Sequence, residues 1–147
     1  HPRAGICLMH MHRDPQTMQM APMVGDALAL VTDFLRDRAA ALMALGVDPT
    51  RIVLDPGIGF GKTVEQNFSL LARQSELLAL GLPLLAGWSR KSSLGAVTGR
   101  KIPAARVAAS VAAAVMAVER GARVVRVHDV RETVDALAIW QAARTGV

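Results

Sequence analysis

The sequence predicts an α/β fold in which parallel strands alternate with helices, and two observations support that prediction. Four short apolar segments alternate with four helical segments, which is the βα order of parallel sheets with right-handed crossovers. The apolar segments are continuous rather than alternating, as in strands covered on both faces. A (β/α)₈ barrel takes about 250 residues and eight such units. The 147 residues therefore suit half of one barrel, and we expect a single domain over residues 1–147 without a linker.

The strands and helices are predicted from apolar runs and from apolar residues at three- and four-residue spacing. The strands cover residues 5–10, 51–54, 83–87 and 123–127. The helices cover residues 24–45, 66–80, 104–120 and 131–143, with a short helical turn after Ser92. Inner faces are expected at Leu28, Val31, Leu35, Ala39 and Leu42 in the first helix, Leu70, Leu71, Leu77 and Leu78 in the second, and Val134, Leu137 and Ala138 in the last.

The central stretch is residues 51–63, RIVLDPGIGFGKT, where a strand runs into a glycine-rich loop. Asp55 follows the strand, Pro56 removes a backbone donor, and the glycines allow conformations that other residues avoid. A Walker A loop would need glycine at Pro56, and the dinucleotide fingerprint fails because only one residue separates Gly59 from Gly61. Asp55 thus lies at the C-terminal end of a strand, where α/β proteins place their chemistry.

The basic excess of the chain is local. The net charge is +5 and the isoelectric point about 10.6, and residues 86–131 contain nine basic residues and two acidic ones. Aromatic residues make up 3%, with no Tyr, which is a poor surface for stacking bases. A solvated basic face accounts for most of these arginines, and a small anionic ligand fits as well as a polynucleotide. We predict neither a nucleic-acid partner nor a membrane, because no apolar run is long enough to span one.

Cysteine usage points to a reducing compartment. Cys7 is the single cysteine, which excludes an internal disulfide framework and fits a cytoplasmic protein. Its position in the middle of a predicted strand favours an inert core residue.

Polar residues gather where the predicted strands end, and parallel strands bring those ends to one rim. Asp55 either caps the glycine loop or accepts two N–H bonds from a ligand. Arg90 and Lys91 are either solvated charges or ligand contacts. Arg126 and His128 are two residues apart and point to one face, where they would clamp an anion. The whole set is His10, His12, Asp55, Ser89, Arg90, Lys91, Arg126 and His128.

A metal site is an open alternative for the histidines. His10 and His12, with Asp55 and His128, have residue types that bind transition metals. Histidines in an isolated H-x-H are more often hydrogen-bonded structural residues.

Four motifs stand in order at the predicted strand ends. They are LMHM at residues 8–11, DPGIGFGK at 55–62, GWSRKS at 87–92 and RVHDV at 126–130. Together they resemble the dihydropteroate synthase family, the bacterial folate-pathway enzymes that sulfonamide drugs inhibit. The resemblance covers essentially the whole chain and implies a (β/α)₈ TIM-barrel type fold, of which this chain supplies the last four βα units.

The resemblance also implies a reaction and a set of contacts. The family condenses 6-hydroxymethyl-7,8-dihydropterin diphosphate with 4-aminobenzoate, giving 7,8-dihydropteroate and diphosphate. No residue is assigned as a general acid or base, and no metal ligand is expected in this half, because Mg²⁺ would bind in the first half. The implied contacts are Asp55, Lys91, Met9 and Gly87 for the pterin, Phe60, Ser89, Arg90 and the stem of Lys91 for 4-aminobenzoate, and Arg126 and His128 for the diphosphate.

Two departures from the family pattern bear on these expectations. His12 and Arg13 stand where many members carry Gln and Gly, which should alter the loop after the first strand but not the pterin slot. The first four βα units are absent, so we expect the chain alone to be weakly active or inactive, or to pair with another copy. The family resemblance implies a homodimer. The alternatives are a non-catalytic pterin- or phosphate-binding half-barrel that self-associates, and a metal-dependent hydrolase using His10 and His12.

Overall fold

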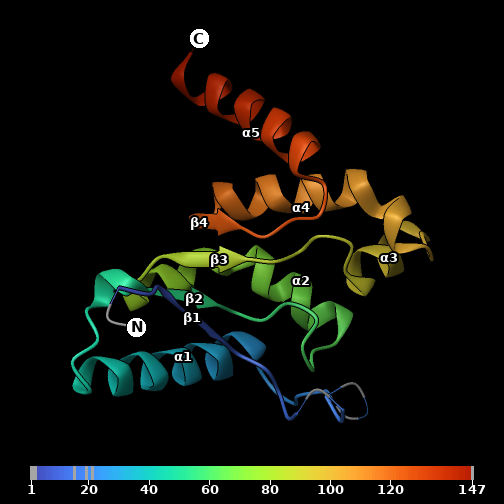
Figure 1. The fold of residues 1–147 in the computed structure, drawn as a ribbon. Helices are drawn as coiled ribbons and strands as arrows, with labels where there is room; N and C mark the ends of the chain where they lie inside the picture. Colours follow the sequence, from blue (N-terminus) through green and yellow to red (C-terminus); the bar gives the residue numbers. More distant parts are fainter. Residues whose placement is uncertain (1–2, 15, 19, 21, 147) are drawn as a thin grey trace.

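The computed structural model describes residues 3–14, 16–18, 20 and 22–146. Its centre is one parallel sheet whose four strands follow chain order (Figure 1). The predicted alternation of strands and helices is confirmed, with bounds that differ by a few residues. The strands are β1 (Ile6–Met9), β2 (Ile52–Asp55), β3 (Leu84–Ala86) and β4 (Ala122–Val125).

The strand register determines which side chains meet at the C-terminal edge of the sheet. Met9 of β1 lies beside Asp55 of β2. Between β3 and β4 the register shifts, so that Leu85 pairs with Val124 and Ala86 with Val125. The backbone N–H of Arg126 then donates to the carbonyl of Ala86 at 3.0 Å, which holds the chain after β4 against the end of β3.

The helices begin and end at residues that satisfy free backbone groups. Asp26 caps the first helix by accepting from the N–H of Leu28, and Thr63 forms a capping box with Gln66 at the second. The α-helices are α1 (Ala27–Ala44), α2 (Val64–Ala72), α3 (Ser92–Thr98), α4 (Val107–Glu119) and α5 (Val130–Thr145), and the 3₁₀ turns are η1 (Pro49–Arg51), η2 (Gln74–Leu80) and η3 (Pro103–Arg106).

The prediction of one helix over residues 66–80 was wrong, because the chain passes from α2 into η2 near Arg73. The buried side chain of Gln74 donates to the carbonyl of Ala117 at 2.8 Å. This tertiary hydrogen bond lies at the start of the 3₁₀ helix η2. A 3₁₀ helix has about three residues per turn, so its side chains point in different directions from those of an α-helix. Leu77 is consequently buried, whereas Leu78 is 43% exposed. The inner face predicted for the first helix is confirmed, with Leu42 partly buried.

Among the described residues, helices cover one face of the sheet and leave the other open, so the expectation of strands covered on both faces was wrong for this part of the chain. Side chains alternate along β2 and β3 between buried positions, such as Leu54 and Leu84, and half-buried ones, such as Val53 and Leu85. The buried set packs against α1, α2 and α4. Cys7 lies on the other face and is exposed, so its assignment to an inert core was also wrong.

The last helix packs on α4 and extends away from the sheet (Figure 1). Among its described residues only Thr133 is buried. Val134 is 57% exposed and Ala138 is exposed, whereas Leu137 is partly buried, so the predicted inner face of this helix is wrong at two of its three residues.

Within the described residues, no single helix is long and apolar enough to cross a membrane. The helices Ser92–Thr98 and Pro103–Glu119, which are bent relative to each other, would together be long and apolar enough by length and composition alone.

Candidate functional site

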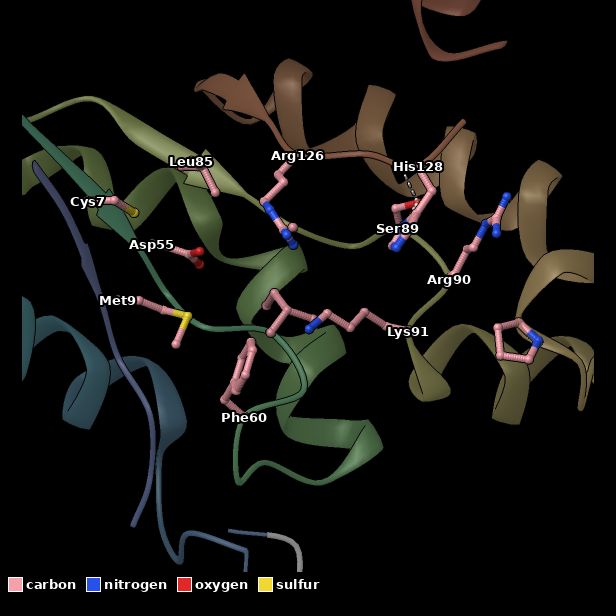
Figure 2. A pocket seen from close by; sticks show the side chains of 13 residues that line it. Cys7, Met9, Asp55, Phe60, Leu85, Ser89, Arg90, Lys91, Arg126 and His128 are labelled. Atoms are coloured by element: carbon pink, nitrogen blue, oxygen red, sulfur yellow. Dashed lines mark hydrogen bonds between the residues drawn. The ribbon is translucent and has the colours of Figure 1, made fainter. Parts of the chain in front are cut away.

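A groove lies at the C-terminal ends of the strands, on the open face of the sheet (Figure 2). Its volume is about 790 Å³. All nine residues that the resemblance assigns to ligand contacts line this groove, although they come from four separate βα units. They are Met9, Asp55, Phe60, Gly87, Ser89, Arg90, Lys91, Arg126 and His128.

The structure adds four lining residues that were not predicted. Cys7 lies two residues before Met9, and Leu85 lies two residues before Gly87. Strand periodicity puts residues two apart on one face, so this pair was within reach of sequence reasoning. Ile58 belongs to the glycine loop and Pro103 to η3, and their approach to the groove depends on tertiary folding.

Asp55 is both a loop cap and a side chain that faces the groove. Its Oδ1 accepts the N–H of Gly57 at 2.7 Å, and its carboxylate points into the open space (Figure 2). Burial raises the pKa of Asp55, while the Gly57 N–H and the charges of Lys91, Lys62 and Arg126 oppose that rise. The two roles left open by the sequence are therefore compatible.

Lys91 lies opposite Asp55 and close to the glycine loop. Its ammonium is 4.1 Å from the centroid of the Phe60 ring, within the range of a cation–π contact. A Cβ at Gly59, which has φ +80°, would lie 3.3 Å from Cδ of Lys91. Burial lowers the pKa of Lys91, and Asp55 partly restores it. Asp55, Lys91 and Phe60 thus enclose a slot with one acidic and one basic side.

Ser89 holds His128 at the far end of the groove. The Ser89 hydroxyl accepts the backbone N–H of His128 at 3.1 Å and lies 3.0 Å from its Nδ1. The Arg126 side chain points into the same space (Figure 2), and no salt bridge to it forms within the described residues. This end can accept a multiply charged anion.

Arg90 is paired with an acidic residue that sequence reasoning did not single out. Its guanidinium donates to Asp129 through Nη2 at 2.6 Å and Nε at 3.2 Å. The pair holds the pKa of Asp129 below its ordinary value. Arg90 therefore borders the groove as a compensated charge, leaving Lys91, Arg126 and His128 as the groups facing an anion.

His10 and His12 do not join the groove, contrary to the expectation of one rim. His10 is 6% exposed, and its ring meets Phe34 edge-on at 5.0 Å. Its Nδ1 is 2.9 Å from the ammonium of Lys62. No three His, Cys, Asp or Glu side chains in the described ranges form a group that could hold a metal ion, so the proposed set of His10, His12, Asp55 and His128 is not assembled.

Comparison with known proteins defines the class. The model of the family described as "Pterin binding enzyme" matches residues 1–128, and the chain belongs to this family. Within it, the relatives of this chain include dihydropteroate synthases. The enzyme of Neisseria meningitidis serogroup C is 52% identical over 139 residues, which cover 94% of this chain and 49% of the relative. The chain thus spans about half the length of such relatives.

Solved structures agree with this assignment. Dihydropteroate synthase from Stenotrophomonas maltophilia superposes with a TM-score of 0.93 at 53% identity, covering 95% of this chain and 53% of that one. The Xanthomonas albilineans enzyme in complex with 7,8-dihydropteroate has a TM-score of 0.88 at 48% identity, with coverages of 95% and 50%. The Yersinia pestis enzyme with a sulfonamide drug has a TM-score of 0.92 at 43% identity, with coverages of 97% and 52%. These neighbours establish an α/β fold of TIM-barrel type.

Proposed function

We propose that this chain is the C-terminal half of a dihydropteroate synthase barrel and that its groove forms the pterin and diphosphate parts of the active site. The observation that carries the proposal is the convergence of nine residues from four βα units on one groove. In a (β/α)₈ barrel the active site lies at the C-terminal ends of the strands, which is where this groove lies. The relatives share both the fold and, by name, the activity.

Asp55 and Lys91 are the proposed pterin contacts. A carboxylate accepts two N–H bonds side by side, and the amino-pyrimidine edge of a pterin offers such a pair. Lys91 would contact the ring from the opposite side, while Met9 and Gly87 would line the slot. Gly87 leaves space there, because a Cβ built on it meets nothing within 4 Å.

The remaining lining residues would hold the other reacting groups. Phe60, Ser89, Arg90 and the aliphatic stem of Lys91 would border 4-aminobenzoate, and Arg126 with His128 would bind the diphosphate. Sulfonamides would compete for the aminobenzoate position. The Yersinia pestis relative was solved with such a drug.

This arrangement suits a displacement in which diphosphate leaves a CH₂ group attached to an electron-rich ring. The C–O bond to diphosphate breaks with its electron pair, and positive side chains around the departing oxygens stabilise the charge. The pterin ring stabilises the carbocation-like carbon, and the neutral arylamine forms the new C–N bond and then releases a proton. No strong base is required.

Magnesium would add charge stabilisation to the leaving diphosphate when bound. Its oxygen ligands would come from outside the groove residues described here, because Asp129 is occupied by Arg90 and Asp55 faces the proposed pterin slot. We therefore assign the ion to the first half of the barrel and no step of the reaction to it here.

Two features bear on the activity of the isolated chain: one face of its sheet is open, and the chain matches about half the length of its relatives. A closed barrel has no free strand edges, whereas the sheet in this chain ends at β1 and β4. We infer that the chain alone is weakly active or inactive, and that the complete cytoplasmic enzyme is a homodimer.

A chimera tests the proposal. Residues 1–147 would replace the matching half of the Neisseria meningitidis relative, and conversion of labelled 4-aminobenzoate into dihydropteroate would be measured. We expect turnover, with kcat/KM reduced at least about tenfold by Asp55→Asn through loss of a charge-assisted hydrogen bond. Asp135→Asn, at an exposed position of α5, should leave it unchanged. A chimera that folds, as judged by circular dichroism, and makes no product would contradict the proposal.

A further inference from the structure

Lys62 is buried behind the groove rather than in it. Its side chain is 5% exposed, and Lys62 is not among the groove-lining residues. Lysine is almost never buried unless its charge is compensated. The proposed ligand contacts in the groove do not involve Lys62. The groups that compensate its buried charge must therefore lie elsewhere.

The ammonium of Lys62 meets three acceptors from two parts of the chain. It is 2.9 Å from Nδ1 of His10, donates to the carbonyl of Gly57 at 2.9 Å and donates to the carbonyl of Phe60 at 3.3 Å. His10 directly follows β1, and the two carbonyls belong to the glycine loop, residues 57–61. Three donors thus meet three acceptors in a buried place.

This contact fixes the state of His10. An ammonium can only donate, so Nδ1 of His10 accepts and the neutral ring carries its proton on Nε2. Burial, followed by the charges of Lys62 and His12, lowers the pKa of His10 to about 4. His10 therefore stays neutral throughout the physiological range and remains available as an acceptor.

The glycine loop presses against the end of β1 at the same place. A Cβ at Gly57, where φ is +68°, would lie only 1.8 Å from the carbonyl oxygen of His10. The N–H of Gly57 donates to Asp55, and the N–H of His10 donates to the carbonyl of Asp55 at 3.0 Å. Gly57 thus orients the Asp55 carboxylate through its N–H, and its carbonyl accepts a hydrogen bond from Lys62.

We propose that Lys62 is a positioning residue of the groove, whose ammonium ties the end of β1 to the glycine loop and thereby sets where Asp55 and Phe60 lie. The clamp itself rests on the geometry alone. Only its consequence for a pterin ligand rests on the proposed function.

The clamp loosens in alkaline solution. The pKa of Lys62 is lowered to about 8, chiefly by burial, while the charge of Asp55 opposes this shift and that of Lys91 adds to it. Above that pH the amine keeps two N–H donors for three acceptors. His10, His12, Asp55 and Lys91 are the titratable groups that act on this pair, and of these Lys91 also loses its proton more readily than an ordinary lysine. The two lysines must therefore be followed separately.

The chain contains three lysines, Lys62, Lys91 and Lys101, so ¹³C-lysine labelling gives a resolvable set of NMR signals. We expect the Lys62 Cε signal to titrate near pH 8, below the ordinary lysine pKa of about 10.4, and ¹⁵N spectra to show His10 protonated on Nε2. A Lys62 signal that titrates at the ordinary lysine pKa, or a His10 ring protonated on Nδ1, would overturn the clamp.

Substitutions connect the clamp to the ligand. Lys62→Met should raise the pKa of His10, shift the Gly57 and Phe60 amide signals, and weaken pterin binding at pH 7 at least about tenfold by misplacing the loop. Lys62→Arg should recover part of that loss, since it keeps a buried donor, and Lys101→Met should change nothing. Unchanged amide shifts and binding in a folded Lys62→Met chain would refute the proposal. If the wild-type chain binds no pterin, the proposed function of the isolated chain fails, while the NMR titration still decides on Lys62.

Discussion

Asp55 shows what the burial of a carboxylate at the end of a strand requires of a single residue position. The side chain is removed from water at the end of β2, and burial raises its pKa despite three nearby cations. One oxygen is used by Gly57, which orients the group toward the groove (Figure 2). A charge kept in this environment destabilises the folded chain relative to a neutral group of the same shape.

Asp55→Asn should therefore raise the melting temperature slightly at pH 7. Burial raises the pKa of Asp55 in the folded chain above its value in the unfolded chain. Between these two pKa values the folded chain binds more protons than the unfolded chain, so the free energy of unfolding falls as the pH rises through this range. The neutral amide removes this loss and can still accept from Gly57. The gain should vanish below the ordinary Asp pKa, where both states are protonated.

Calorimetric melting from pH 3 to pH 8 checks this expectation, with Asp135→Asn as an exposed control. A lower melting temperature for Asp55→Asn at pH 7 would mean that attraction to Lys91, Lys62 and Arg126 outweighs the burial of the carboxylate.

Nine of the residues that line the groove could be recognised from sequence motifs. The residues that support those side chains from behind could not. Asp55 and Lys91 stand in conspicuous local sequences at strand ends. Lys62, Asp129 and Arg106 act through partners that are distant in the chain or through backbone carbonyls, and a buried charge has no signature in composition or periodicity. His10 was misplaced for the same reason, since its contact with Phe34 is tertiary.

At the scale of elements, the segment from Ser89 to Arg106, which includes α3 and η3, is stabilised by one buried guanidinium. Arg106 donates to the carbonyl of Arg90 at 2.8 Å, of Arg100 at 2.8 Å and of Lys101 at 2.6 Å. Arg90 has φ +59°, a left-handed conformation that costs about 1 kcal/mol or more in a residue with a Cβ. Its N–H donates to the hydroxyl of Ser110 at 2.9 Å. The strained residue that borders the groove is thus held from both sides.

Arg106→Ala should lower the free energy of unfolding by about 3 kcal/mol, because three carbonyls lose a buried donor. The measurement is urea denaturation followed by circular dichroism. Arg100→Ala is the matched control, since the Arg100 side chain is exposed and its carbonyl remains in place, and we expect a change within about 0.5 kcal/mol. Equal effects of the two substitutions would show that Arg106 has no anchoring role.

The existence and order of the elements could be predicted because local periodicity determines them. The face of α1 followed from apolar spacing, whereas η2 and the exposure of α5 did not. Gln74 changes the helix type through a bond to Ala117. The apolar residues of α5 suggested a buried face, but α4 is the main element that contacts this helix, and a sequence pattern does not reveal which neighbour is present.

At the scale of the whole molecule, helices cover one face of the sheet (Figure 1). The other face carries the groove (Figure 2). In the proposed closed barrel, the free edges of β1 and β4 would pair with the strands of further βα units. Under the proposed function, the four βα units assemble the groove by themselves, whereas the enclosure that excludes water from a reaction would come from the rest of the barrel.

The central claim is that these four units contain the pterin site, and calorimetric titration of the 147-residue chain with 6-hydroxymethylpterin diphosphate tests it most directly. We predict binding by the wild-type chain, a loss of at least about tenfold in affinity for Asp55→Asn and for Lys91→Ala, and unchanged binding for Asp135→Asn. A folded wild-type chain that binds no pterin, or one whose binding survives both substitutions, would contradict the claim.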